Sequence, residues 1–316
     1  MNHLRGVSAG PGFPADHFDG WVHSVFGSAA NLRLRDGRLV TLLTADHANQ
    51  PRATRVDAPA GFRFEEALRA GQIAACRAGT LRFGGAAVQI ELGGVWRWEE
   101  EIRALTLQRG SADGGALRIA LDELARHPGA RVGIAGAVIT MDGEETAPAR
   151  AAGGPIGALI AAARELDVRE ASAAAARLIG LGPGLTPSGD DFLAGFLAGA
   201  WAAAAGDAAR ARFVEALGGE IVRRSVQTND ISRGFLDDAA RGWAAEPVIR
   251  LIEGVYGGER VSVRAAARGV LGMGSSSGAD VMAGVVSAVG LDLNVGYRGA
   301  FEDTLGLRAI QCPLTT

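Results

Sequence analysis

Hydrophobic and polar residues alternate along the first part of the chain, a pattern that predicts β-strands. In 23–44, alternating leucine and arginine lead into an Asp-Gly pair and then into a second apolar run, which predicts a hairpin with a tight turn. The same pattern in 79–92, around a Gly-Gly pair, predicts a second hairpin. Between the two hairpins, 64–70 is expected to form a short helix.

Apolar residues recur at helical spacing after Ala116, so the rest of the chain is expected to be mainly helical. The expected helices are 117–125, 156–166, 168–179, 192–205, 208–223, 234–244, 248–255, 261–271 and 281–289. The stretch 141–154 carries glycine, proline and acidic residues, so we expect a loop and a domain boundary there. The predicted fold class is α+β, with a strand-rich N-terminal region at 1–145 and a helical region at 146–316. The nearly uncharged helices 192–205 and 281–289 are expected to be buried.

The composition narrows the range of functions. The 316 residues carry a net charge of −3, so no excess of basic charge is available to neutralise a nucleic-acid backbone. All 32 basic residues are arginine, which excludes a Schiff-base or phosphate-loop lysine. Cys76 and Cys312 are far apart and suit a reducing compartment, and the five histidines lack the spacing of a zinc site. No secretory signal or membrane span is recognised, so we expect a cytoplasmic protein.

The most informative stretch is GLGPGLTPSGDDFLAG at 180–195. It is a loop rich in glycine and proline that leads directly into an apolar helix. A helix N-terminus presents unpaired N–H groups and the positive end of the helix dipole, so anions bind there. We therefore expect a small anionic ligand at this loop. The candidate binding residues are Gly182, Gly184, Thr186, Ser188 and Gly189.

A second copy of this pattern occurs at 272–284, where Gly-x-Gly and a short polar loop precede Ser-Gly-Ala-Asp and another apolar helix. The repeat predicts two glycine-loop-to-helix units that face each other across a shared cleft. Gly274 and Ser277 therefore join the candidate anion-binding residues.

The acidic residues of the two copies have two interpretations. Ser188 with Asp191, and Ser277 with Asp280, have the S-x-x-D spacing of a capping box, which would make them simple N-caps. Asp190 has no acidic counterpart in the second copy, so capping does not require it. The candidate catalytic residues are Asp190 and Asp191.

Carboxylates beside an anion site would repel the ligand, and the sequence leaves three arrangements open. The carboxylates turn away and act as caps, or a divalent cation such as Mg²⁺ lies between them and the anion, or they accept N–H groups from an amide or ureido ligand. Mg²⁺ is therefore a candidate cofactor, although no set of metal-ligating residues is assigned.

A polar segment at 223–233 is the second candidate for ligand binding. Its arginines could form a fork for a carboxylate or phosphate, and its hydroxyl and amide side chains could add donors. The candidate residues are Thr228, Asn229 and Ser232. The same residue types favour turns and caps, so a polar loop with an N-cap is the alternative.

Three stretches resemble a bacterial family that includes the AllH-type subunit of oxamate carbamoyltransferase. They are GLGPGLTPSGDDFLAG at 180–195, with the family's hallmark GLTPSGDDFL complete at 184–193, QTNDISRGFLDDAARG at 227–242 and HSVFGSAANLRL at 23–34. The resemblance implies a transferase subunit of allantoin degradation, a route of purine catabolism. Such an enzyme would move a carbamoyl group between oxalurate and phosphate, giving carbamoyl phosphate and oxamate. The resemblance also implies FdrA-type and related partner subunits in a multi-subunit complex.

The residues are compatible with that reaction. Carbamoyl transfer needs two anionic reactants held close together and fixed donors for the developing oxyanion. On this hypothesis the 182–188 loop binds phosphate or a carboxylate, and Asp190 or Asp191 orients the ureido nitrogen or a water-bound cation. The alternative is a non-catalytic ligand-binding or scaffold subunit whose partner performs the chemistry. The sequence leaves the oligomeric state open, a homo-oligomer included.

Overall fold

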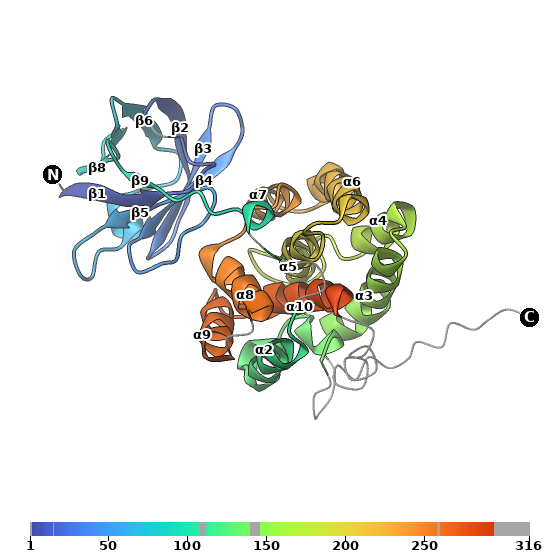
Figure 1. Cartoon of the computed structure of the whole chain (residues 1–316). Helices are drawn as coiled ribbons and strands as arrows, with labels where there is room; N and C mark the ends of the chain where they lie inside the picture. Colours follow the sequence, from blue (N-terminus) through green and yellow to red (C-terminus); the bar gives the residue numbers. More distant parts are fainter. Residues whose placement is uncertain are drawn as a thin grey trace, which may run out of the picture. The chain divides into compact units, whose positions relative to one another are not determined.

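The computed structural model describes residues 2–14, 16–105, 107, 112–139, 146–257 and 260–293. Contacts divide the chain into two units, Met1–Glu100 and Glu101–Thr316. The first unit is built of strands with one short helix and the second of helices, so the predicted α+β class is confirmed (Figure 1). The division predicted from the sequence lies between residues 145 and 146, so it assigned α2 (Gly114–Arg126) to the N-terminal region. An amphipathic pattern predicts a helix but does not reveal which unit that helix packs against.

The N-terminal unit is a closed barrel. Its strands are β1 (Asn2–Ala9), β2 (Phe18–Val25), β3 (Ala29–Leu34), β4 (Leu39–Thr44), β5 (Ala53–Asp57), β6 (Ile73–Arg77), β7 (Thr80–Phe83) and β8 (Val88–Glu91), with β9 (Trp96–Arg97) paired to the end of β1. The hydrogen-bonded order β5-β4-β3-β2-β6-β7-β8-β1 closes because β1 also pairs with β5. Closure removes the free edges that an open sheet would present.

Both hairpins predicted from the alternation are confirmed. β3 and β4 pair antiparallel around Asp36 and Gly37, and Gly37 takes a φ of 87°, which glycine adopts without steric cost. β7 and β8 pair antiparallel around the Gly-Gly pair. Leu32 and Leu81 are fully buried in the hydrophobic core of the unit. The short helix expected between the hairpins is α1 (Phe64–Ala67).

The strands that complete the barrel were not predicted. β1 pairs parallel with β8 and antiparallel with β5, and its register against β5 shifts between Gly6 and Ser8. β6 carries Cys76, a free and fully buried thiol, whereas Cys312 lies outside the described residues. These pairings join segments far apart in the chain, and local alternation does not specify them.

The C-terminal unit contains every helix that the apolar spacing predicts. After α2 come α3 (Ala147–Arg164), α4 (Val168–Ala176), α5 (Ser188–Ala203), α6 (Ala208–Arg224), α7 (Asp230–Ala240), α8 (Glu246–Gly257), α9 (Arg260–Leu271) and α10 (Ser277–Val289). Short 3-10 turns include η1 (Ile102–Ala104), η2 (Pro128–Arg131), η3 (Ala135–Ala137), η4 (Ser225–Gln227) and η5 (Gly290–Asp292).

The loop expected at 141–154 is wrong in its second half, because α3 already begins at Ala147. The hydroxyl of Thr146 accepts the N–H of Ala149 and caps this helix, and a proline lies in its first turn. Gly153 and Gly154 lie inside the helix, where glycine is unfavourable by only about 1 kcal/mol each. Tertiary packing overrides a local preference of that size.

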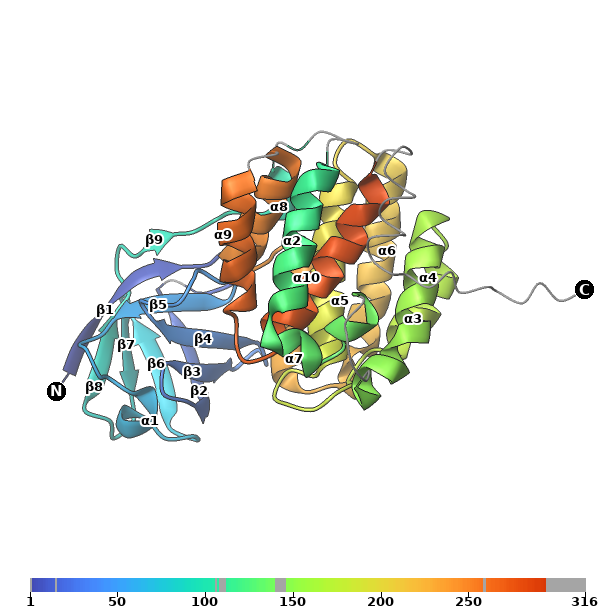
Figure 2. The ribbon, with the colours of Figure 1, turned by 90° about the horizontal axis from the view of Figure 1, so that it is seen from below.

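Helices α5 and α10 lie side by side in the middle of the helical unit (Figure 2). Both are buried along almost their whole length, as their lack of charge predicts. A Cβ atom on Gly195 would lie 2.0 Å from the carbonyl oxygen of Val281, and one on Gly284 would lie 2.1 Å from that of Phe192. Gly195 and Gly284 are counterparts in the sequence repeat, as are Phe192 and Val281. The two contacts are therefore reciprocal, and an approximate two-fold axis relates the two parallel helices.

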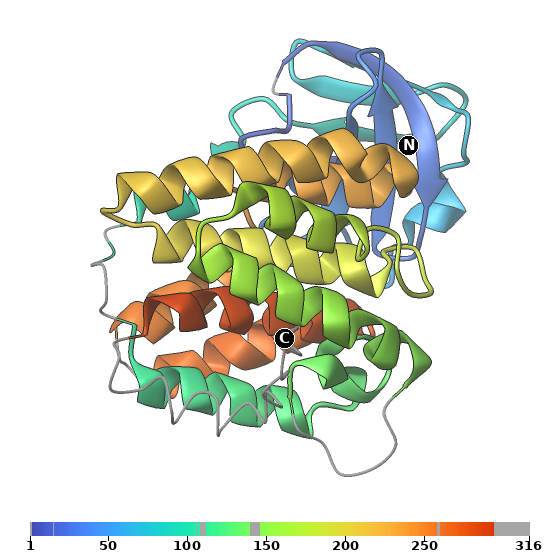
Figure 3. The same cartoon turned by 90° about the vertical axis from the view of Figure 1, so that its right-hand side faces the viewer.

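The other helices surround this pair. α2 and α9 contact α10, whereas α6 and α7 contact α5. Figure 3 shows α6, α5 and α10 extending in roughly one direction, as the gold, yellow and red ribbons. Among the described residues, no helix combines the length and the apolar character that a membrane crossing requires.

Candidate functional site

The two glycine loops deliver α5 and α10 to the same place. Gly189 N donates to Leu181 O, and the equivalent Gly278 N donates to Met273 O, both at 2.8 Å. Each loop thus folds back on its own helix by an equivalent bond. The Thr186 and Ser277 hydroxyls, 2.9 Å apart, join the two N-termini, whereas the shared cleft stays a prediction. The N–H groups of Gly189 and Gly278 in the first helical turns are therefore already hydrogen-bonded within the protein. Anion binding stays a prediction for Gly182, Gly184, Gly189 and Gly274.

The capping interpretation of the two serines is wrong. Pro187 precedes the first turn of α5 and Ser276 that of α10, and neither supplies a side-chain cap. Ser188 and Ser277 are the first helical residues instead. Burial raises the pKa of Asp191 and of Asp280, and a serine hydroxyl from the opposite helix offsets part of each increase, Ser277 for Asp191 and Ser188 for Asp280. Sequence spacing cannot distinguish a cap from a contact between two helices.

Asp190 connects three segments. Its Oδ1 accepts the N–H of Gly180 at 2.8 Å, and its Oδ2 accepts the hydroxyl of Thr228 at 2.5 Å. The residue is 2% exposed, and both carboxylate oxygens are occupied. Asp190 therefore holds the glycine loop and the second polar segment together, which corresponds to the arrangement in which the carboxylate turns away from the ligand. A catalytic role for Asp190 stays a prediction.

Asp191 lies beneath the glycine loop. Its Oδ2 accepts the hydroxyl of Thr186 at 3.0 Å, and that hydroxyl lies 2.9 Å from the Ser277 hydroxyl. Burial raises the pKa of Asp191 to about 7, the Ser277 and Thr186 hydroxyls lower it in part, and the charges of Asp280 and Asp190 add to the increase. A carboxylate with hydroxyl partners from both loops can bind and orient a ligand group.

Asp280 is a site residue that the sequence analysis assigned only to helix capping. Its Oδ1 accepts the N–H groups of Ile134 at 2.8 Å and Ala135 at 2.9 Å, whereas its fully buried Oδ2 has no hydrogen-bond partner. Burial raises the pKa of Asp280 to about 6, and the Ser188 hydroxyl and the two N–H groups offset part of that increase. The only signal in the sequence was the alignment of Asp280 with Asp191 in the repeat.

The second polar segment reaches the same site. Asn229 accepts the N–H groups of Ile231 and Ser232 and so caps α7, which confirms the N-cap alternative, and its Nδ2 also donates to Leu185 O of the glycine loop at 2.9 Å. Ser232 is buried and its hydroxyl has no partner. Ligand binding by Thr228, Asn229 and Ser232 stays a prediction.

The arginines of this segment pair with carboxylates of their own helices. Arg223 and Arg224 approach Glu220, and Arg233 lies 3.2 Å from Asp230. To bind a carboxylate or phosphate ligand as predicted, these arginines would first have to break their ion pairs with the protein's own carboxylates.

Replacing Thr228 by valine is expected to lower the free energy of unfolding by about 2 kcal/mol, because a buried carboxylate oxygen of Asp190 loses its donor. Urea denaturation at neutral pH measures this. Thr228→Ser keeps the hydroxyl and should behave as the wild type, and equal losses in the two variants would contradict the importance of this bond.

No three histidine, cysteine or acidic side chains among the described residues converge so as to hold a metal ion. A cavity of about 250 Å³ is formed at the other end of α5, where Ala203, Asp207, Arg210 and Leu291 contribute to its wall. None of the site residues predicted from the sequence lines this cavity. Those residues lie at the N-terminal ends of the helices instead.

Fold and site together define a class: an α+β protein with a closed barrel and a helical unit whose two central helices begin at a cluster of carboxylates and hydroxyls. Two family models match the chain, one described as oxamate carbamoyltransferase subunit AllH over residues 178–289 and one as the AllH family N-terminal domain over residues 11–97. The chain belongs to the AllH family. The family is named for a subunit of oxamate carbamoyltransferase, a component of a multi-subunit enzyme. No solved structure matches the chain.

Proposed function

We propose that this chain is a subunit of a carbamoyltransferase and binds its small anionic substrates at the N-termini of α5 and α10. The supporting observation is the group of hydroxyls and carboxylates at these N-termini, contributed by both halves of the repeat and by the 223–233 segment. The matched family supplies the reaction class, since its name specifies transfer of a carbamoyl group involving oxamate.

In the proposed reaction, a phosphate oxygen attacks the carbamoyl carbon of oxalurate. A carbon–oxygen bond to phosphate forms and the carbon–nitrogen bond to the leaving group breaks. The departing nitrogen takes up the proton that the attacking hydrogen phosphate releases, which gives oxamate. Negative charge develops on the carbamoyl oxygen during the attack, and fixed hydroxyl or N–H donors stabilise it. Thr186 and Ser277 are the proposed donors. The Thr186 hydroxyl, which donates to Asp191 in the free protein, turns to the carbamoyl oxygen, and Asp191 then accepts an N–H of the carbamoyl group instead.

Such a reaction depends on positioning more than on covalent chemistry by the protein, which suits a site without lysine. The proposal includes a cytoplasmic role in allantoin degradation and assembly with FdrA-type partner subunits. The alternative is a ligand-binding or scaffold subunit, with the reacting groups on a partner.

The test measures phosphate-dependent cleavage of oxalurate by the complex reconstituted with its partner subunits. Thr186→Val and Ser277→Ala are each expected to lower kcat/KM by about a hundredfold, the usual loss on removing one oxyanion donor. Ser275→Ala is the matched control, because Ser275 is an exposed residue of the second loop outside the proposed site. Near wild-type turnover in folded, assembled Thr186→Val and Ser277→Ala variants would support the scaffold alternative instead.

A further inference from the structure

The approximate two-fold axis between α5 and α10 passes through a set of paired oxygen-bearing side chains. Asp191 and Asp280 are counterparts across the axis, and so are Ser188 and Ser277. Each serine hydroxyl lies near the aspartate of the opposite helix, where it offsets part of the increase in pKa that burial causes. Thr186 adds a fifth side chain, whose hydroxyl lies 3.0 Å from Asp191 Oδ2 and 2.9 Å from Ser277 Oγ.

No basic side chain among the described residues faces this group as a counter-charge. Asp191 is 5% exposed and Asp280 is 0% exposed, and no arginine or histidine among the described residues forms an ion pair with either. Two helix N-termini supply about half a positive charge each, which offsets about one of the two negative charges. Buried carboxylates normally have a counter-charge.

One oxygen in the group is free to bind a ligand. The N–H groups of Ile134 and Ala135 fix Oδ1 of Asp280, so the carboxylate cannot rotate without losing two bonds, and its other oxygen has no partner although it is fully buried. The serine and threonine hydroxyls each keep lone pairs that can ligate a cation. All the available ligand atoms are oxygens, the set that hard cations such as Mg²⁺ prefer.

We propose that a divalent cation of the Mg²⁺ class binds on this axis, with Asp191 and Asp280 as its carboxylate ligands and Ser188 and Ser277 beside it. Mg²⁺ is held by one or two carboxylates and keeps several of its waters, so a group of three acidic residues is not required. Such a cation removes the repulsion between the carboxylates and an anionic substrate. Its role in substrate binding rests on the proposed function, whereas its binding to the protein does not.

The experiment titrates MgCl₂ into the metal-free full-length chain by isothermal calorimetry, with MnCl₂ and CaCl₂ in parallel. Asp191→Asn and Asp280→Asn are each expected to weaken Mg²⁺ binding at least tenfold. The amide introduced by Asp280→Asn keeps an oxygen that accepts the two N–H groups, so this variant retains the fold. Asp167→Asn is the matched control, because Asp167 is an exposed N-cap of α4 whose single accepting oxygen asparagine retains, and it should bind Mg²⁺ as the wild type does.

Thermal denaturation provides a second measurement. Saturating MgCl₂ should raise the Tm of the wild type and of Asp167→Asn by several degrees and leave that of the other two variants unchanged. Absence of binding by all three cations, or equal binding by the wild type and Asp280→Asn, would overturn the proposal. Mg²⁺ binding without any carbamoyl transfer would instead reject the proposed function and leave the cation site standing. Full transfer activity in metal-free buffer would reject the cation's role in substrate binding and leave the proposed function intact.

Discussion

Substituting alanine for Gly284 is expected to lower the free energy of unfolding by about 3 kcal/mol, at the upper end of the range for overpacked cores. The new Cβ atom would lie 2.1 Å from the carbonyl oxygen of Phe192 and 2.6 Å from the nitrogen of Phe196. Both are backbone atoms of the neighbouring helix, so no side-chain rotation can relieve the clash, and α5 and α10 must move apart. Urea denaturation monitored by circular dichroism measures the loss.

Two further alanine variants test this interpretation. Gly195→Ala is the two-fold counterpart, with a Cβ 2.0 Å from the carbonyl oxygen of Val281, and should be equally destabilising. Gly219→Ala is the control, because Gly219 lies within α6 with nothing within 4 Å of the added atom. That variant should match or exceed wild-type stability, since alanine is favoured over glycine in a helix by roughly 0.5–1 kcal/mol. If Gly284→Ala and Gly219→Ala were equally stable, the close packing of α5 on α10 would be contradicted.

The sequence predicted the centre of the helical unit well because two kinds of information agreed there. The repeat of glycine loop, serine, aspartate and apolar helix specified two equivalent units, and the scarcity of charge in α5 and α10 specified that both are buried. Pattern and composition both describe burial, and burial is what brings these two helices together.

The features that the sequence did not predict depend on contacts between distant segments. Closure of the barrel requires β1 to pair with both β5 and β8, and nothing within its eight residues specifies those partners. The capping spacing of Ser188 and Asp191 is local, but their partners lie on the opposite helix or in the preceding loop. A spacing rule describes one helix and carries no information on what packs against it.

The same limit explains why the sequence could not say which of the three proposed arrangements each carboxylate adopts. Asp190 accepts donors from Gly180 and Thr228, whereas Asp191 accepts the hydroxyl of Thr186. Asp280 accepts the N–H groups of Ile134 and Ala135. Adjacent residues of one helix point in directions about 100° apart, so Asp190 and Asp191 meet different surroundings. The sequence could name both residues but could not assign them different environments.

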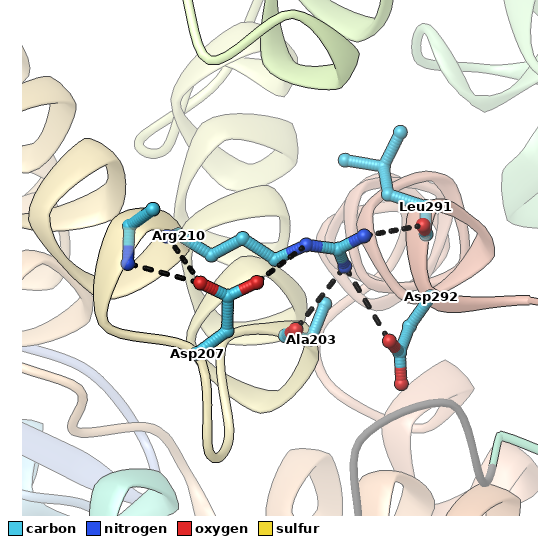
Figure 4. A network of polar contacts seen from close by, with 6 residues as sticks. Ala203, Asp207, Arg210, Leu291 and Asp292 are labelled. Atoms are coloured by element: carbon cyan, nitrogen blue, oxygen red, sulfur yellow. Dashed lines mark hydrogen bonds and ion pairs between the residues drawn. The ribbon is translucent and has the colours of Figure 1, made fainter.

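Removing the charge of Arg210 is expected to destabilise the opposite end of the helix pair. Arg210 of α6 donates to the carbonyl oxygens of Ala203 and Leu291, at the ends of α5 and α10, and lies 3.4 Å from Asp292 and 3.6 Å from Asp207 (Figure 4). The negative ends of two parallel helix dipoles meet here, and Asp292 is 3% exposed at its side chain. Arg210→Met should therefore lower the free energy of unfolding by about 3 kcal/mol, the lower end of the range for breaking a buried pair.

The appropriate control is an arginine whose ion pairs are exposed. Arg250 pairs with Glu246 and Glu253 along α8, and such pairs contribute about 0.5 kcal/mol or less. Arg250→Met removes the same charge with the same replacement, so guanidinium denaturation of the two variants isolates the effect of location. Guanidinium chloride also screens exposed pairs, which reduces the expected effect at Arg250 further. Equal midpoints for the two variants would show that the ends of α5 and α10 do not need a cation, and that Asp292 is stabilised by its other neighbours.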